Sequence, residues 1–125
     1  MNSERSQAAV HDHLHQLDEE LALSRVGGDT DLLHEIVDLF LADYPATLEK
    51  IRAAVSARDA VAIEHHAHSL KGSVSTFGAQ SAFEAALALE RQGRNGDLGD
   101  VDAGLSQLEF ALGALRPELE SIQAR

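Results

Sequence analysis

The chain has no cysteine and no tryptophan, and aromatic residues make up only 4% of its 125 positions. The missing thiols exclude disulfide bonds, thiolate metal sites and cysteine nucleophiles. They are also consistent with the reducing cytoplasm, where we expect the protein to be located. Because aromatic side chains are so few, the core must be built from Leu, Ala, Ile and Val, which favours a bundle of packed helices.

Basic residues and long apolar runs are scarce as well. The 10 Lys and Arg stand against 21 Asp and Glu, so the formal net charge is −11. An acidic surface repels phosphate backbones, and we therefore expect no nucleic-acid partner. No apolar run approaches the roughly 20 residues of a membrane-spanning helix, so we expect no membrane association. At this length we predict a single domain, residues 1–125, with a monomer as the default state.

Apolar residues recur at helical spacing along most of the chain, and no stretch alternates with the period of a β-strand. This pattern predicts an all-α fold, an antiparallel four-helix bundle with a short additional N-terminal helix. We expect residues 1–10 to be a frayed tail and the bundle to cover about residues 16–122. The predicted helices cover about residues 14–25, a long segment from Asp29 or Thr30 past Val55, and then 59–76, 81–92 and 101–122.

Proline and glycine mark the expected interruptions. Pro45 predicts a bend or a short break within the long second helix. Gly78 is the expected C-cap of the third helix. The stretch 93–99 contains three glycines and is predicted to be a loop. Pro117 falls near the end of the last helix and should distort its final turns.

The third predicted helix has a histidine, His68, on its polar side. On a helical wheel, the apolar residues of this helix define the core direction, and His68 lies about 140° away from it. We therefore expect its imidazole to face solvent. Several polar or small residues share this side of the helix within two turns. They are Glu64, His65, Lys71, Gly72 and Ser75.

These residue types suit phosphoryl transfer. A neutral imidazole is a nucleophile, and its attack on a phosphoryl group gives a phosphoramidate that can pass the group onward. Such transfer requires mainly positioning and charge stabilisation. Lys71 can place an ammonium beside the transferred oxygens, and Ser73 or Ser75 could add a hydrogen bond. Glu64 could hold the second ring nitrogen of the imidazole, although a group from a neighbouring helix would serve as well.

Gly72 is the unusual neighbour of His68. A glycine within a helix costs about 1 kcal/mol relative to alanine. Because Gly72 lies on the exposed side, core packing does not require it. Its missing side chain leaves open space beside the imidazole, through which a bulky partner could bring its own reactive group. The alternative is a neutral glycine that the helix tolerates.

The segment from Ala67 to Ser73, Ala-His-Ser-Leu-Lys-Gly-Ser, followed by Gly78-Ala79, resembles the signature of histidine-containing phosphotransfer (HPt) domains. Other segments resemble the same family. They are residues 26–33, Phe40 to Pro45, Leu89-Glu90 and the glycine-rich stretch after it. The resemblance covers about residues 16–122.

The resemblance implies a role for each main site residue. It implies that His68 receives a phosphoryl group from the aspartyl phosphate of a receiver domain in a hybrid histidine kinase. His68 would then donate the group to the receiver of a response regulator, with Lys71 and Gly72 assisting. No cofactor or metal is expected on this chain, because Mg²⁺ belongs to the receiver in this family. Apolar side chains on the second helix should be exposed near His68, where a receiver would dock.

Three other functions compete with phosphoryl transfer. An autophosphorylating histidine kinase is disfavoured because the chain has no nucleotide-binding loop and no acidic residue directly after His68, so we expect no ATP-dependent autokinase activity. A metal-binding module would use His11, His13 and His15, but no ligands at bundle-type spacing accompany them. A non-transferring adaptor of HPt-like shape, which binds a kinase or response regulator, is the remaining alternative.

Two histidines directly precede Ala67 and His68. His66 lies at the edge of the core direction and is predicted to be a partly buried packing residue. His65 is predicted to be exposed, but it has Ser69 four residues later, where His68 has Gly72. We therefore predict that His68, and neither neighbour, is the acceptor.

Overall fold

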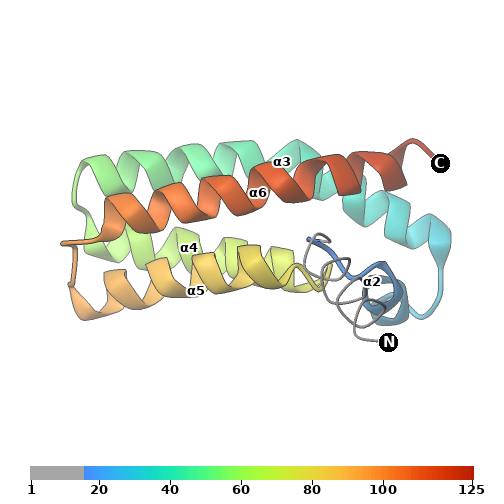
Figure 1. Cartoon of the computed structure of the whole chain (residues 1–125), viewed down its shortest axis with the longest axis horizontal. Coiled ribbons are helices and arrows are strands. Elements are labelled where there is room, and N and C mark those ends of the chain that lie inside the picture. The colour runs from blue at the N-terminus through green and yellow to red at the C-terminus, as the bar shows by residue number, and fades with distance from the viewer. Residues whose placement is uncertain (1–15) are drawn as a thin grey trace, which may run out of the picture.

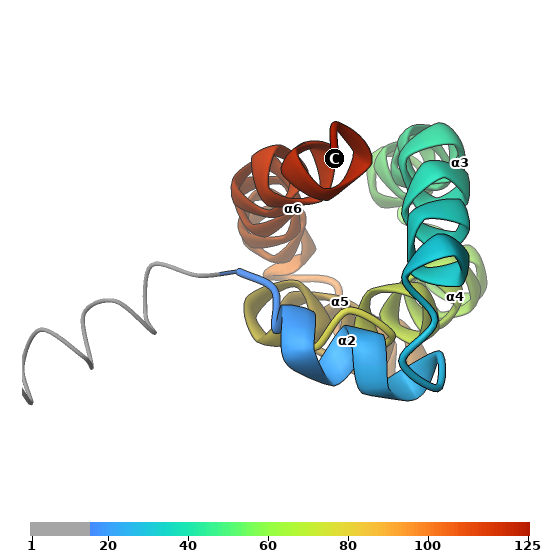
Figure 2. The same ribbon diagram turned by 90° about the vertical axis from the view of Figure 1, so that its right-hand side faces the viewer.

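The computed structural model describes residues 16–125, which form five α-helices and no β-strand. Four long helices lie side by side, and the short helix α2 (Glu19–Arg25) lies across one end (Figures 1 and 2). The predicted four-helix bundle with a short N-terminal helix is therefore confirmed. No helix of residues 16–125 is long and apolar enough to cross a membrane. The helices are α2 (Glu19–Arg25), α3 (Thr30–Ser56), α4 (Ala60–Ser75), α5 (Gln80–Asn95) and α6 (Val101–Gln123).

Aspartates begin the first three of these helices. Asp18, Asp29 and Asp59 are the N-caps, and the side chain of each accepts a hydrogen bond from the backbone N–H three residues later. The expected start of the first helix near residue 14 is wrong for residues 16–18, because Asp18 caps a helix that begins at Glu19. Positions 14 and 15, and the expected tail over 1–10, lie outside the described residues.

The long helix α3 passes through Pro45 without a break. Proline removes one backbone hydrogen bond, but Leu41, Tyr44 and Leu48 are buried on both sides of it. Their packing holds the helix together across the missing bond. Of the two predicted options, the short break does not occur, and α3 bends along its length as a continuous helix (Figure 1). Pro117 is likewise accommodated inside α6, which continues to Gln123.

Helix α5 is longer than the sequence indicated, because it includes Gly93 and ends at Asn95. Gly93 is buried against α4. A Cβ atom at this position would lie 2.7 Å from the carbonyl oxygen of Ala60 and 2.7 Å from the backbone nitrogen of Glu64. Gly93 therefore lets the two backbones approach closely, and the loop begins at Gly96, which has φ = 66°.

The turn between α4 and α5 supports α2. The C-cap of α4 is Thr76, and Gly78, which was expected in that role, follows with φ = 60°. A Cβ on Gly78 would lie 2.8 Å from Cβ of Asp18, and the Asp18 backbone N–H donates to the carbonyl of Phe77 over 2.9 Å. The turn is therefore packed tightly beneath the start of α2.

The core consists of aliphatic and a few aromatic side chains from all four long helices. Phe40 stacks on Tyr44 at a ring-centroid distance of 5.0 Å and meets Phe77 edge to face at 5.2 Å. Among the described residues, the only charged side chain in the buried set is Glu90 on α5, which is 2% exposed. A buried carboxylate is costly unless it is paired, so its partners mark a place where the fold serves more than packing.

Candidate functional site

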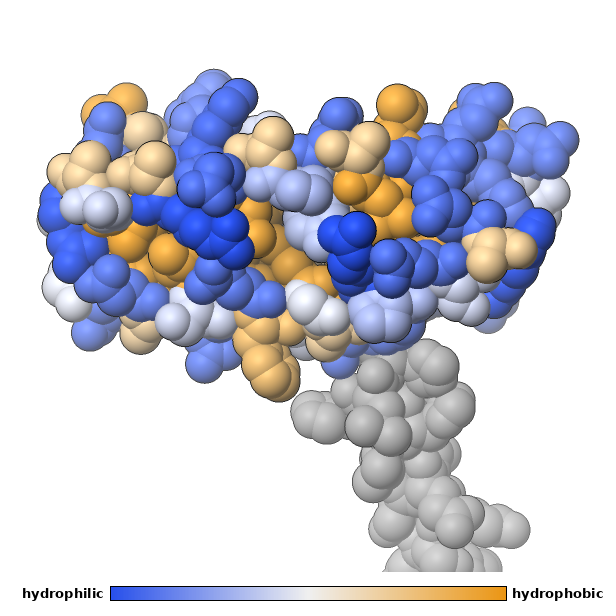
Figure 3. All heavy atoms as spheres, turned by 90° about the horizontal axis from the view of Figure 1, so that it is seen from above, coloured by the Kyte–Doolittle hydropathy of each residue, from blue (hydrophilic) through white to orange (hydrophobic). Residues whose placement is uncertain are grey.

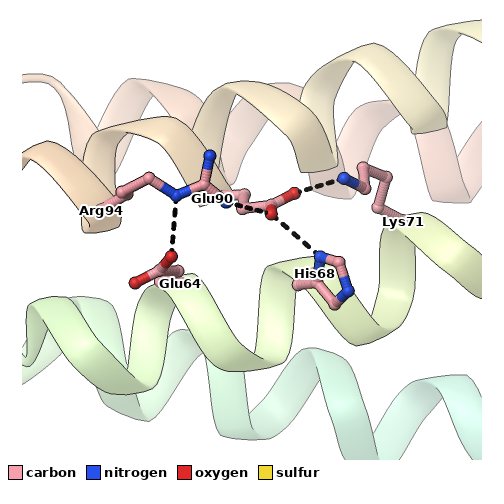
Figure 4. Close-up of polar contacts among 5 residues, drawn as sticks. All are labelled: Glu64, His68, Lys71, Glu90 and Arg94. Carbon is pink, nitrogen blue, oxygen red and sulfur yellow. Dashed lines mark hydrogen bonds and ion pairs between the residues drawn. The ribbon is translucent and has the colours of Figure 1, made fainter.

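His68 lies in the middle of α4, and its side chain is 68% exposed. The opposite side of the helix buries Ile63, Ala67, Leu70 and Val74 in the core. The exposure predicted from the helical wheel is therefore confirmed. Nδ1 of the imidazole lies 2.9 Å from Oε2 of Glu90 on α5, and Nε2 points away from that carboxylate (Figure 4).

Glu90 is the centre of a small charge network between α4 and α5. Its Oε1 lies 2.7 Å from Nζ of Lys71, and its Oε2 accepts from Nη2 of Arg94 at 2.6 Å as well as facing His68. The hydrogen bond with Lys71 is the largest cause that lowers the pKa of Glu90 to about 2, and the contact with His68 lowers it further against the opposing effect of burial. Glu90 is therefore ionised at neutral pH and can act only as an acceptor.

An ionised partner determines the tautomer of His68. Because Glu90 has no proton to donate, Nδ1 must carry the hydrogen in the neutral ring, and the lone pair is then on Nε2. Nε2 is the nitrogen that points away from Glu90. The contact thus directs the nucleophilic nitrogen outward, where an incoming group can reach it.

Glu64 does not hold the imidazole of His68, contrary to one of the two options that the sequence left open. Its Oε2 accepts a hydrogen bond from Nε of Arg94 at 2.9 Å. The partner of the ring comes from the neighbouring helix, because the ring leans across the close α4–α5 contact (Figure 4). The available signal was a glutamate within the core stripe of α5, whose other buried members are Ala82, Ala86, Leu89 and Gly93.

Lys71 is on the same side of α4 as His68 and is 20% exposed, with its ammonium held by Glu90. The two serines are engaged within their own helix. Ser73 Oγ donates to the carbonyl of Ser69 at 3.3 Å, and Ser75 Oγ donates to the carbonyl of Gly72 at 2.9 Å. Of the expected supporting residues, the structure therefore brings Lys71 to the network around the imidazole and directs the serine hydroxyl hydrogens elsewhere.

Gly72 is exposed, and a Cβ atom built on it would meet nothing within 4 Å. Nothing in the described part of the chain therefore requires a glycine at this position. The open space beside His68 that the sequence suggested is therefore present. It also means that any requirement for glycine at this position comes from something that approaches the surface.

The two neighbouring histidines differ from His68 in the expected way. His66 is half-buried, and burial is the largest cause that lowers its pKa. His65 is exposed, and its ring meets the ring of His66 edge to face at 5.1 Å. His11, His13 and His15 lie outside the described residues. Within residues 16–125 there is no group of three or more His, Asp or Glu side chains arranged to hold a metal ion.

Apolar side chains are exposed on both sides of His68. Leu39 on α3 is 62% exposed and lines a groove between α3 and α4 together with Ser69 and Ser73. Val61 is 77% exposed and lines a second hollow, which includes His68 itself. The expectation that α3 exposes apolar residues near His68 is confirmed.

The chain is similar to known proteins over most of its length. A family model described as the Hpt domain matches residues 35–124. The crystal structure of histidine-containing phosphotransfer protein B from Pseudomonas aeruginosa PAO1 is 30% identical with a TM-score of 0.82, covering 88% of this chain and 96% of that one. The HPT domain from a sensor hybrid histidine kinase of Shewanella is 20% identical with a TM-score of 0.79, covering 89% and 96%, and shows the fold alone. No curated protein sequence matches the chain.

Proposed function

Because the chain belongs to the Hpt domain family, whose members carry phosphoryl groups in phosphorelays, we propose that His68 is its phosphoryl acceptor. The donor would be the aspartyl phosphate of one receiver domain, and the recipient would be the aspartate of another. The observation that supports this proposal most directly is the contact between Nδ1 of His68 and the ionised, buried Glu90. We expect the exchange to take place in the cytoplasm, where receiver domains act.

The proposed transfer uses the outward nitrogen of the ring. The lone pair of Nε2 forms a bond to phosphorus while the bond from phosphorus to the donor carboxylate oxygen breaks, and that oxygen keeps the electron pair. The ring then carries a positive charge with its hydrogen still on Nδ1, and Glu90 lies in position to stabilise it. In the second step a carboxylate oxygen of the recipient attacks phosphorus, the N–P bond breaks, and the pair returns to Nε2.

The surface around His68 suits a protein partner that covers both of its sides. Leu39 and Val61 offer apolar contact, and the open space over Gly72 lets the partner's backbone come close to the ring. The ammonium of Lys71, which lies 2.7 Å from Oε1 of Glu90, would interact with the transferred phosphoryl oxygens. We propose that a receiver docks here, with its Mg²⁺ supplied by its own site.

The test is transfer of a radiolabelled phosphoryl group from a phosphorylated receiver to the full chain. We expect His68→Ala to abolish labelling, whereas His65→Ala and His66→Ala retain it. Labelling of the His68→Ala variant would show that another residue is the acceptor. Incubation with labelled ATP alone should leave the protein unlabelled. If the unsubstituted chain binds receivers but takes no label from any of them, the protein is a non-transferring adaptor.

A further inference from the structure

We infer that Arg94 is a positioning residue for His68 that acts through Glu90. This inference rests on the acceptor role proposed for His68. Arg94 lies on α5, one turn after Glu90, and its side chain is 54% exposed. Its polar contacts are with Glu64 and Glu90 and not with Nε2 of His68, so direct catalysis does not account for it.

The geometry of Arg94 links three side chains. Its Nη2 lies 2.6 Å from Oε2 of Glu90, the same oxygen that lies 2.9 Å from Nδ1 of His68. Its Nε lies 2.9 Å from Oε2 of Glu64 on α4 (Figure 4). Because Glu64 holds one arm of the guanidinium, the other arm is directed at the oxygen that the imidazole also uses.

Sharing one oxygen makes Arg94 a competitor of the imidazole. A guanidinium on Oε2 neutralises part of the carboxylate charge and takes one of its lone pairs, so the carboxylate attracts the protons of His68 less strongly. The Arg94–Glu64 pair is exposed and contributes little by itself, whereas the Arg94–Glu90 contact ends on a buried oxygen, where charge is screened less. Arg94 therefore affects His68 mainly through Glu90.

The charged groups that face His68 come from two helices, and α3 adds one at a distance. Asp43 of α3 lines the groove on the other side of Ser69. Around His68, two carboxylates are balanced by two permanent cations, so removing Arg94 leaves an excess of negative charge. The facing groups are Glu64, His65 and Lys71 on α4, and Glu90 and Arg94 on α5.

This balance matters for the proposed transfer because a doubly protonated ring has no lone pair on Nε2 and cannot attack phosphorus. A stronger negative charge on Glu90 favours the doubly protonated ring. Arg94 would therefore extend the range of pH over which His68 can accept a phosphoryl group, by keeping its ring neutral at lower pH. Glu64 supports this role by holding the guanidinium in place.

The experiment follows the ring protons of His68 by NMR as the pH is varied, and measures the rate of phosphoryl acceptance over the same range. We expect Arg94→Ala to move the titration midpoint of His68 upward, and the acid limb of the acceptance rate to move with it. Arg94→Lys keeps the charge and should restore most of the midpoint.

The matched control is Arg116→Ala. Arg116 forms the same kind of i, i+4 pair, with Glu120 on α6, and its removal changes the net charge equally without touching the network. The titration midpoint of His68 in the Arg116→Ala variant should equal that of the unsubstituted chain. If Arg94→Ala also leaves the midpoint unchanged, the inference is wrong. The NMR measurement needs no receiver, so these outcomes are distinguishable from a failure of the proposed transfer, which His68→Ala tests.

Discussion

The α4–α5 pair and the α3–α6 pair of the bundle are joined by different polar contacts. Between α3 and α6, one side-chain hydrogen bond lies on the surface, from Arg52 to Glu109 at 2.7 Å, and another runs from the exposed Arg116 to the hydroxyl of the buried Tyr44 at 2.9 Å. Between α4 and α5, His68 and Lys71 of α4 both contact the buried Glu90 of α5, and Arg94 of α5 pairs with Glu64 of α4. The face above α3 and α6 accordingly shows hydrophilic residues with apolar ones between them (Figure 3).

The difference shows that the two pairs of helices serve different purposes. A surface ion pair adds little stability and can be lost without harm, whereas a buried carboxylate is tolerated only when its partners remain in place. The α3–α6 pair is thus sufficient to complete the bundle. The α4–α5 pair holds a charge at a fixed position beside His68, at a cost that folding alone does not require.

The largest difference in stability between the two pairs of helices is expected when a carboxylate in each pair is replaced by an amide. Glu90→Gln leaves Lys71 without its charged partner and Arg94 with Glu64 alone, and we expect it to lower the free energy of unfolding at pH 7 by about 2 kcal/mol. The equivalent change in the other pair, Glu109→Gln, should cost no more than about 0.5 kcal/mol. Urea denaturation followed by circular dichroism measures both.

The pH dependence of the stability lost in Glu90→Gln tests whether the charge of Glu90 is its cause. The pKa of Glu90 is held at about 2, below its ordinary value of 4.5. A carboxyl group whose pKa is lowered by folding contributes its full stabilisation above the ordinary value and loses it as the pH falls toward the folded value. The gap between the unsubstituted chain and Glu90→Gln should therefore shrink between pH 4.5 and pH 2. A gap that is constant over this range would assign the effect to packing.

Two glycines of the α4–α5 pair, one buried and one exposed, should respond oppositely to substitution by alanine, with smaller effects on the free energy of unfolding. Gly93→Ala places a methyl group 2.7 Å from backbone atoms of α4, and we expect it to lower the free energy of unfolding by about 1–2 kcal/mol. Gly72→Ala meets open space and should raise it by about 0.5–1 kcal/mol, because alanine favours the helix.

The functional consequence of Gly72→Ala should oppose its gain in stability. If a partner needs the open surface beside His68, the variant should accept phosphoryl groups several-fold more slowly than the unsubstituted chain. The rate of labelling by a phosphorylated receiver, measured beside a urea denaturation curve, separates the two effects. A variant that is both more stable and equally fast would show that glycine has no role at this position.

Most of the fold could be predicted from the sequence, because helix caps and apolar spacing are local signals. Asp29 and Asp59 stand at the predicted starts of two helices, and in the structure they are the N-caps of α3 and α4. The errors have a common cause in tertiary packing. The sequence left a bend or a break open at Pro45, and packing of its buried neighbours keeps α3 unbroken. Gly93 extends α5 because another backbone lies against it. Neither effect can be seen from one segment alone.

The candidate site was predictable where it depends on one helix and unpredictable where it depends on two. The exposure of His68 and the position of Lys71 on its side follow from the periodicity of α4. The partner of the imidazole does not, because Glu90 is 22 residues away and reaches His68 only through the packing of α5 on α4. The same packing explains why Glu64 bonds to Arg94.

The central claim is that Glu90 holds Nδ1 of His68 and leaves Nε2 to accept the phosphoryl group. The most direct measurement is a ¹H–¹⁵N NMR spectrum of the chain, labelled with ¹⁵N at histidine and phosphorylated by a receiver, with ³¹P coupling used to identify the bonded nitrogen. We predict phosphorus on Nε2 of His68, with a hydrogen still on Nδ1. Phosphorus on Nδ1 of His68, or on any nitrogen of another histidine, would contradict the account.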